Sequence, residues 1–323
     1  MVSPSSPASS GPADTGPAVA LDGLRMTYGG TVAVDGLSLE VARGSVTAVL
    51  GPNGAGKTTT LETCEGYRKP QAGTVRVLGL DPQAQRRELL PRIGVMLQDG
   101  GAWSGVRAVE MLEHVAALHA HPLDVPMLVE RLGLGPCGRT PYRRLSGGQH
   151  QRLGLAMAIV GRPELVFVDE PTAGMDPQSR RATWALLEEM RADGVTIVLT
   201  THYMEEAEQL ADTVHVIDHG RLIATGSPFE LTRGTGHSTI RLVVTEPFPP
   251  GAPASLQTAL GEATDVQALN EHSLLITGPA DATTLATVSA WCEKHAVLPE
   301  SLSLGRRTLE DVFIQLTGRE LAS

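Results

Sequence analysis

Short apolar runs alternate with longer stretches of helical spacing over residues 19–236. Apolar and β-branched residues dominate four strand-sized runs, at residues 46–50, 165–168, 196–199 and 214–217. Continuous apolar runs of this length are typical of parallel strands that are buried on both faces. Because these runs alternate with helical stretches, the pattern predicts an α/β domain.

The pattern changes at two places along the chain. Residues 101–160 show helical spacing and few strand signals, which indicates a helical insertion. Residues 237–323 mix short strands with helices, which predicts a small α+β domain, with the split βαβ layout as one arrangement. The expected elements there are strands at 240–245, 265–269 and 273–277, helices at 256–260, 280–295 and 309–317, and one further strand between the last two helices.

The first 18 residues are almost entirely small residues and proline. A segment of Ser, Pro, Gly and Ala buries too little surface to offset the entropy lost on ordering, so we predict a disordered tail at residues 1–18.

Composition narrows the class of protein. The chain has 323 residues, and 41% of them are hydrophobic, which is enough for a sizeable core. The net charge of −10 argues against a nucleic-acid partner bound through its phosphates. A membrane-spanning helix needs about 20 apolar residues in a row. No run approaches that, and the three cysteines have no metal-binding spacing. We therefore expect a soluble protein with reduced thiols and any membrane role exercised through a partner.

A phosphate-binding loop follows the first buried strand. The sequence GPNGAGKTT matches G-x-x-x-x-G-K-[ST] between a predicted strand and a predicted helix. Glycines let successive backbone N–H groups face phosphate oxygens, and the helix N-terminus adds positive potential. A flexible glycine loop is the alternative, but Lys57 is one of only three lysines in an arginine-rich chain. We assign ATP binding to Gly51, Pro52, Asn53, Gly54, Ala55, Gly56, Lys57, Thr58 and Thr59, with Lys57 on the β- and γ-phosphates and Thr58 on Mg²⁺.

Two acids end a second buried strand, in LVFVDEP. Asp169 at the strand tip is expected to hold Mg²⁺, directly or through water. Glu170 is expected to activate the attacking water as general base. A solvated acidic turn is the common alternative, and the preceding phosphate loop makes the catalytic interpretation the better one.

The segment LSGGQ supplies a second anion-binding helix start. Its serine caps a helix and its glycines leave N–H groups open, so Ser146, Gly147, Gly148 and Gln149 are candidate nucleotide contacts. A single phosphate site has no need of two such helix starts. Two copies of the chain are therefore expected to face each other, each closing on ATP held by its twin.

With these motifs in order, residues 21–231 resemble the nucleotide-binding subunits of ATP-binding-cassette (ABC) transporters. The resemblance implies a P-loop NTPase fold with a mixed sheet and a helical subdomain, followed by the small C-terminal α+β domain. It also implies ATP and Mg²⁺ as cofactors, a homodimer, a separately encoded membrane permease, and a peripheral location on the cytoplasmic side of the membrane. Four further residues follow from it: Tyr28 stacking on adenine, Gln98 contacting Mg²⁺, Asp176 at the dimer interface and His202 contacting the γ-phosphate.

Three segments are similar to the ATPases of type-2 exporters, including the daunorubicin/doxorubicin-resistance group. They are residues 62–82, 202–212 and 308–321. An importer motor and a non-transport ABC ATPase acting on ribosomes or DNA remain alternatives. His150 and Met175 depart from the usual family residues, and we expect modest tuning at most from either.

Overall fold

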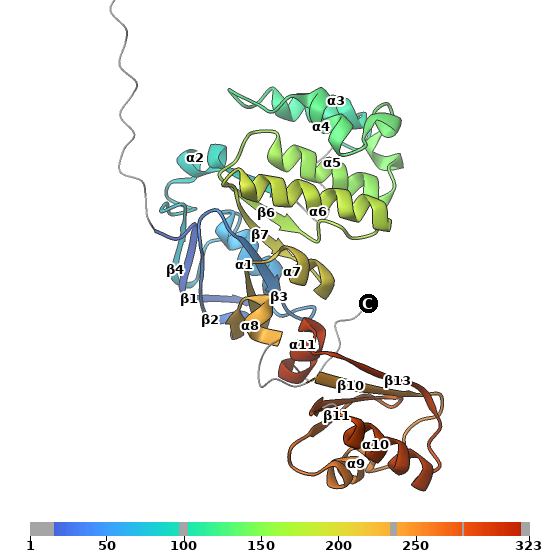
Figure 1. Ribbon diagram of the computed structural model, residues 1–323. Helices are drawn as coiled ribbons and strands as arrows, with labels where there is room; N and C mark the ends of the chain where they lie inside the picture. Colours follow the sequence, from blue (N-terminus) through green and yellow to red (C-terminus); the bar gives the residue numbers. More distant parts are fainter. Residues whose placement is uncertain (1–15, 97–102, 233–237, 280, 318–323) are drawn as a thin grey trace, which may run out of the picture. The chain divides into compact units, whose positions relative to one another are not determined.

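A computed structural model of the chain describes residues 16–96, 103–232, 238–279 and 281–317 (Figure 1). Most of the predicted tail, residues 1–15, lies outside this range. Ala18, at the end of that prediction, is fully buried, and its N–H donates to the Val41 carbonyl at 2.7 Å. The chain forms two compact units, one of residues up to Ser45, Thr58–Val168 and Thr172–Val198, the other of Val46–Lys57, Asp169–Pro171 and residues from Leu199 onward.

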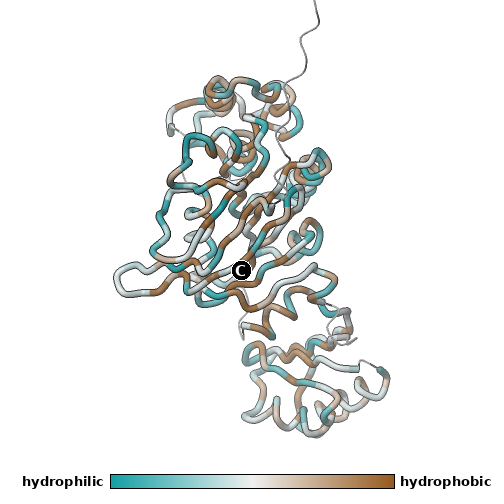
Figure 2. The backbone as a smooth tube through the Cα atoms, turned by 90° about the vertical axis from the view of Figure 1, so that its left-hand side faces the viewer, coloured by the Kyte–Doolittle hydropathy of each residue, from teal (hydrophilic) through white to brown (hydrophobic). Residues whose placement is uncertain are grey.

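The predicted α/β fold with a mixed sheet is confirmed. The larger sheet has the strand order β5-β6-β7-β3-β8-β9; β5–β6 and β3–β8 are parallel, whereas β9 is antiparallel to β8. Every residue of β3 and β7 is buried, as the continuous apolar runs predict. Figure 2 shows hydrophobic stretches along extended segments of the backbone. The strands are β3 (Val46–Leu50), β5 (Ile93–Met96), β6 (Leu165–Asp169), β7 (Thr196–Thr200), β8 (Thr213–Asp218) and β9 (Arg221–Gly226).

A separate antiparallel sheet is formed by two strands before the phosphate loop and one strand after it, and the sequence pattern did not reveal it. Its order is β2-β1-β4, formed by β1 (Val19–Tyr28), β2 (Thr31–Val41) and β4 (Ala72–Val77). Buried and exposed positions largely alternate along β2 from Val34 onward, as expected for a sheet packed on one face only. This pairing joins β1 to β4, which is far away in sequence, so local pattern could not predict it.

In its described residues, the predicted helical insertion contains three α-helices, α3 (Ala108–Ala116), α4 (Val125–Arg131) and α5 (Gly147–Ile159). No helix in the described parts of the chain has the length and apolarity needed to cross a bilayer. The remaining helices before residue 233 are α1 (Lys57–Cys64), α2 (Arg86–Leu89), α6 (Pro177–Ala192), α7 (Met204–Leu210) and α8 (Pro228–Thr232), with 3₁₀ turns at Leu90–Arg92, Gly135–Cys137 and Tyr142–Arg144.

The C-terminal region has the β-α-β-β-α-β order of the split βαβ layout. Its sheet has the order β11-β12-β10-β13, and each neighbouring pair is antiparallel. Ile240, Leu242 and Val244 of β10 share a buried core with Leu256 of α9 and Trp291 of α10. The elements are β10 (Ser238–Val244), α9 (Ala252–Leu260), β11 (Asp265–Asn270), β12 (Ser273–Gly278), α10 (Ala282–Lys294) and β13 (Pro299–Arg306).

Two carboxylates accept backbone N–H groups at the start of the last described helix, α11 (Leu309–Thr317). The buried Asp311 accepts the Thr308 N–H at 2.9 Å and the Thr239 hydroxyl at 3.2 Å. Glu208 of α7 accepts the Leu309 N–H at 2.6 Å. Carboxylates at a helix N-terminus satisfy free N–H groups and favour the helix dipole, so these contacts hold α11 against α7 and β10.

Gly94 allows α5 to lie directly on β5. A Cβ added there would stand 2.1 Å from the Ala158 carbonyl oxygen. We therefore expect Gly94→Ala to lower the free energy of unfolding by about 1–3 kcal/mol through overpacking, measured by urea denaturation. Gly105→Ala is the control, because an added Cβ there meets nothing within 4 Å. Equal stability of both variants would contradict this packing.

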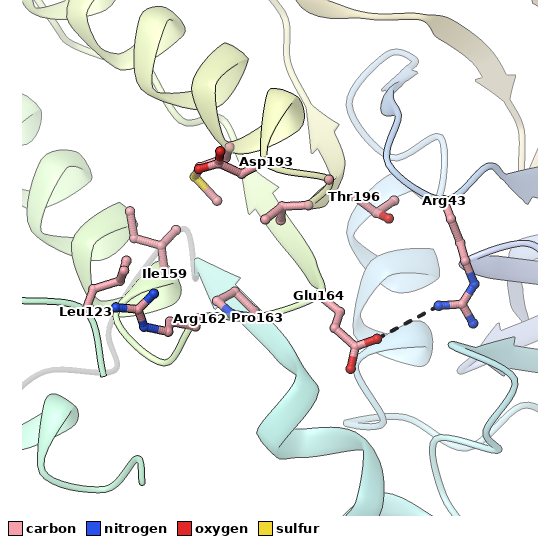
Figure 3. A pocket seen from close by; sticks show the side chains of 11 residues that line it. Arg43, Leu123, Ile159, Arg162, Pro163, Glu164, Asp193 and Thr196 are labelled. Atoms are coloured by element: carbon pink, nitrogen blue, oxygen red, sulfur yellow. Dashed lines mark ion pairs between the residues drawn. The ribbon is translucent and has the colours of Figure 1, made fainter. Parts of the chain in front are cut away.

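A pocket of about 400 Å³ lies where β6 and β7 begin, lined by apolar side chains such as Leu123 and Ile159 and by charged ones (Figure 3). At its edge Arg92 holds Glu164 through two hydrogen bonds of 2.6 and 2.8 Å, and Arg43 lies 3.9 Å from the same carboxylate. The Arg92 guanidinium is the main reason that the pKa of Glu164 is lowered.

Glu164→Gln is expected to lower the free energy of unfolding at pH 7 by only about 0.5–1 kcal/mol, because half of the Glu164 side chain is exposed and solvent screens the pair. The lowered pKa makes this stabilisation complete above the unfolded pKa of about 4.3. It is lost as the pH falls through the folded-state value. Chemical denaturation of both proteins from pH 7 to pH 3 checks this: a difference that stays constant with pH would argue against the ion pair.

Candidate phosphate site

The phosphate loop joins the buried strand β3 to helix α1. Gly54 and Gly56 have φ values of +81° and +101°, which glycine adopts without a Cβ clash. A Cβ added at Gly51 would lie 2.3 Å from the Ile217 carbonyl oxygen, so the end of β3 needs glycine beside β8. The loop consists of Gly51, Pro52, Asn53, Gly54, Ala55 and Gly56, and Lys57, Thr58 and Thr59 form the first turn of α1.

Lys57 folds back over this loop. Its Nζ donates to the carbonyl oxygens of Gly51 at 2.6 Å and Pro52 at 3.2 Å. Burial lowers the pKa of Lys57, while the charges of Asp169 and Glu170 act in the opposite direction. The ammonium therefore lies in the same charged cluster as both carboxylates, and these residues belong to one compact unit.

Asp169 ends β6 and is held by the neighbouring strand. The Thr200 hydroxyl at the end of β7 donates to Asp169 Oδ1. A carboxylate has two oxygens, so it can accept a hydrogen bond and still ligate a cation. The sequence analysis assigned no role to Thr200. Two threonines, Thr200 and Thr201, follow the apolar residues 197–199, and this change to polar residues could have indicated a functional position.

Glu170 has a backbone conformation that side chains rarely adopt. Its φ is +50°, in the left-handed region, and its N–H donates to the Thr200 carbonyl at 3.0 Å. His202, which follows β7, places Nδ1 3.1 Å from Glu170 Oε1, and the His202 ring lies 4.0 Å from the Tyr203 ring. Left-handed backbone at a non-glycine residue concentrates at functional sites. The structure thus brings together Lys57, Asp169, Glu170 and His202.

The LSGGQ segment starts helix α5, as its sequence predicts. The Ser146 hydroxyl accepts the Gln149 N–H at 3.4 Å, and Gln149 Oε1 accepts the Ser146 N–H at 2.8 Å, forming a capping box. Ser146 and Gly147 are exposed. A Cβ added at Gly148 would lie 3.4 Å from Met175 Cγ. Met175, which differs from the usual family residue, therefore lies beside this helix start.

Asp176 caps helix α6. Its Oδ1 accepts the N–H groups of Gln178 and Ser179, each at 3.0 Å, and its Oδ2 accepts the Ser179 hydroxyl at 2.6 Å. These hydrogen bonds, that of the Ser179 hydroxyl first, lower the pKa of the exposed Asp176 carboxyl. Within one chain, Asp176 therefore acts as an N-cap, accepting N–H groups in the first turn of α6.

The two remaining predicted contacts are Tyr28 and Gln98. Tyr28 is the last residue of β1 and is 39% exposed, as expected of an aromatic side chain available for stacking. Gln98 lies outside the described residues, in the gap between residues 96 and 103.

Known proteins resemble this chain in sequence. The sequence pattern of the family described as "ABC transporter" matches residues 34–173. The daunorubicin resistance ATP-binding protein DrrA3 of Streptomyces coeruleorubidus is 37% identical over 313 residues, 95% of this chain and 97% of that protein. The Nod factor export ATP-binding protein I of Ralstonia nicotianae is 38% identical, over 94% of this chain and 95% of that protein.

Among solved structures, cbiO1 from Clostridium perfringens, part of the ABC transporter complex cbiONQ, is 29% identical with a TM-score of 0.58 and covers 68% of this chain and 92% of its own. An ATP-binding subunit of an ABC transporter, at 24% identity and a TM-score of 0.62, shows the same fold over 68% of this chain and 93% of its own. Identity above one third along nearly the full length of the curated relatives, together with the strand–loop–helix around Lys57, shows that this chain belongs to the ABC transporter family, as an ATP-binding subunit that hydrolyses ATP.

Proposed function

We propose that this ATPase powers the export of a small molecule through a separately encoded membrane subunit. The relatives named for daunorubicin resistance and Nod factor export match 94–95% of this chain and so include its C-terminal region. The solved cassette of cbiO1 covers only 68% of it. That extended likeness favours an exporter over the importer alternative, which shares the catalytic motifs.

The contact between His202 and Glu170, 3.1 Å apart beside the Lys57 loop, is the observation that carries the catalytic proposal. Lys57 and the loop N–H groups would hold the β- and γ-phosphates, and the Glu170 carboxylate would take a proton from the attacking water. His202 would orient that carboxylate and contact the γ-phosphate. Catalysis then comes from positioning and charge neutralisation.

Magnesium fits the residues at this site. Within the described ranges no group of three or more His, Cys, Asp or Glu side chains could hold a metal ion. Mg²⁺ is commonly bound through one or two protein oxygens, substrate phosphates and water, and needs no such cage. We infer that the Thr58 hydroxyl and the Asp169 carboxylate hold it, with Gln98 as a third contact. When bound, Mg²⁺ neutralises charge on the phosphates.

Two copies are proposed to share each ATP. The exposed start of α5, at Ser146 and Gly147, presents N–H groups and the positive end of a helix dipole. In a dimer this start, with Gly148 and Gln149, would contact the γ-phosphate held by Lys57 of the twin, and Asp176 would lie at the interface. We place the dimer at the cytoplasmic side of the membrane, bound to the permease.

The dimer proposal is tested with two variants. Glu170→Gln with ATP is expected to run as a dimer in size-exclusion chromatography with light scattering. Adding Ser146→Asp keeps a helix-capping acceptor but places negative charge against the γ-phosphate, so the double variant should bind ATP and stay monomeric. Dimers in both proteins, or in neither, would contradict this arrangement.

The export proposal is tested by purification from membranes. We expect the tagged chain to co-purify with a protein of about six membrane spans, and vesicles holding both to accumulate a daunorubicin-like compound on ATP addition. Recovery with ribosomes or DNA instead would favour the non-transport alternative.

A further inference from the structure

A cation lies against the one aromatic ring assigned to the nucleotide base. The guanidinium carbon of Arg68 is 5.0 Å from the centroid of the Tyr28 ring, within the range of a cation–π contact. The Nε of the same arginine bonds to the Glu62 carboxylate on helix α1. Arg68 therefore connects the tyrosine at the end of β1 to the helix that begins at Lys57.

The backbone around Arg68 is fixed from both sides. The N–H groups of Tyr67 and Arg68 donate to the Glu62 carbonyl at 2.9 and 3.2 Å, which folds the segment back onto α1. The Gln71 side chain donates to the Thr27 carbonyl at 2.9 Å, which ties the segment to β1. Because its backbone is held and its Nε is bonded to Glu62, Arg68 has fewer conformations to lose in keeping its place on the ring.

We propose that Arg68 is a positioning residue for the nucleotide, holding one face of the Tyr28 ring so that a purine base stacks on the rest of it. This rests on the proposed role of Tyr28. With Arg68 in place Tyr28 is still 39% exposed, so ring surface is left for a second planar group. A cation on one face draws electron density from the ring, which favours stacking of an electron-rich base on the other.

This arrangement predicts which ligands depend on Arg68 for binding. Stacking uses the face of a base and reads none of its edge groups, so adenine and guanine should gain equally from Arg68. A chain of phosphates without a base should gain nothing. Glu62 affects base stacking only indirectly, because its carboxylate holds the Arg68 guanidinium.

Calorimetric titration of the full chain with ATP, GTP and inorganic tripolyphosphate tests this. Arg68→Ala should weaken ATP and GTP binding alike, by about two- to five-fold, and leave tripolyphosphate binding unchanged. Arg68→Lys should recover part of the loss, and Glu62→Gln should show a smaller loss than Arg68→Ala. Arg25→Ala is the matched control, because Arg25 lies on β1, the strand that carries Tyr28, and its guanidinium pairs with Asp35 at 3.9 Å.

The double variant Tyr28→Ala/Arg68→Ala tests the role of Arg68 separately from the assignment of Tyr28 to the base. It should bind ATP no more weakly than Tyr28→Ala alone, because Arg68 acts through the ring. Additive losses, or tighter ATP binding by Arg68→Ala, would overturn the role of Arg68 only. Unchanged ATP binding by Tyr28→Ala would overturn the assignment of Tyr28 itself.

Discussion

Replacing Glu170 by glutamine is expected to stop ATP turnover while ATP binding persists. Glutamine has nearly the same shape, so it can keep the left-handed backbone at this position and the contact with His202, 3.1 Å away. An amide cannot accept the proton of the attacking water, and loss of a general base lowers rates by about 10²- to 10⁴-fold. Phosphate release under saturating ATP, with the Kd for ATP measured separately, checks both statements.

The control for this change is Glu113→Gln, on the exposed surface of α3. It removes one carboxylate of the same type and should hydrolyse ATP like the wild type. If Glu170→Gln also turns over at the wild-type rate, another group is the base. If ATP binding disappears as well, Glu170 supports the loop rather than the chemistry.

Replacing Lys57 by alanine is expected to weaken ATP binding itself, by about 10- to 100-fold, the worth of hydrogen bonds from a charged donor. The ammonium lies over the loop, bonded to the Gly51 carbonyl at 2.6 Å, where phosphate oxygens can replace that acceptor. Burial lowers the pKa of Lys57, so ATP affinity should fall as the pH rises through that value, below the ordinary 10.5. Displacement of a fluorescent ATP analogue at several pH values measures both effects.

Two further variants make the Lys57 result specific. Lys69→Ala removes another lysine, which is exposed, and should bind ATP normally. Lys57→Arg keeps the charge but places a planar guanidinium in a space shaped for a compact ammonium, so it should not restore affinity. Unchanged ATP binding by Lys57→Ala would remove the basis of the phosphate-loop assignment.

Patterns of neighbouring residues predicted many of the helices, strands and loop motifs of this protein. The glycines and lysine of residues 51–57 determine a strand–loop–helix because few residues tolerate φ values such as the +101° of Gly56. Ser146 with Gln149 three positions on predicts a capped helix, and the structure forms that capping box. The C-terminal strands and helices were equally readable, since hydrophobic periodicity is a property of neighbouring residues.

Only the tertiary structure decided which distant residues meet. The pairing of β1 with β4, the Thr200 hydroxyl on Asp169 and the approach of His202 to Glu170 join segments that the chain alone does not bring together. Arg68 on the Tyr28 ring is of the same kind. Such contacts depend on how strands order themselves in a sheet and how loops return to it, and residue type at a single position carries no record of that order. The sequence thus predicted which groups carry the proposed chemistry, and strand pairing decided which of them face one another.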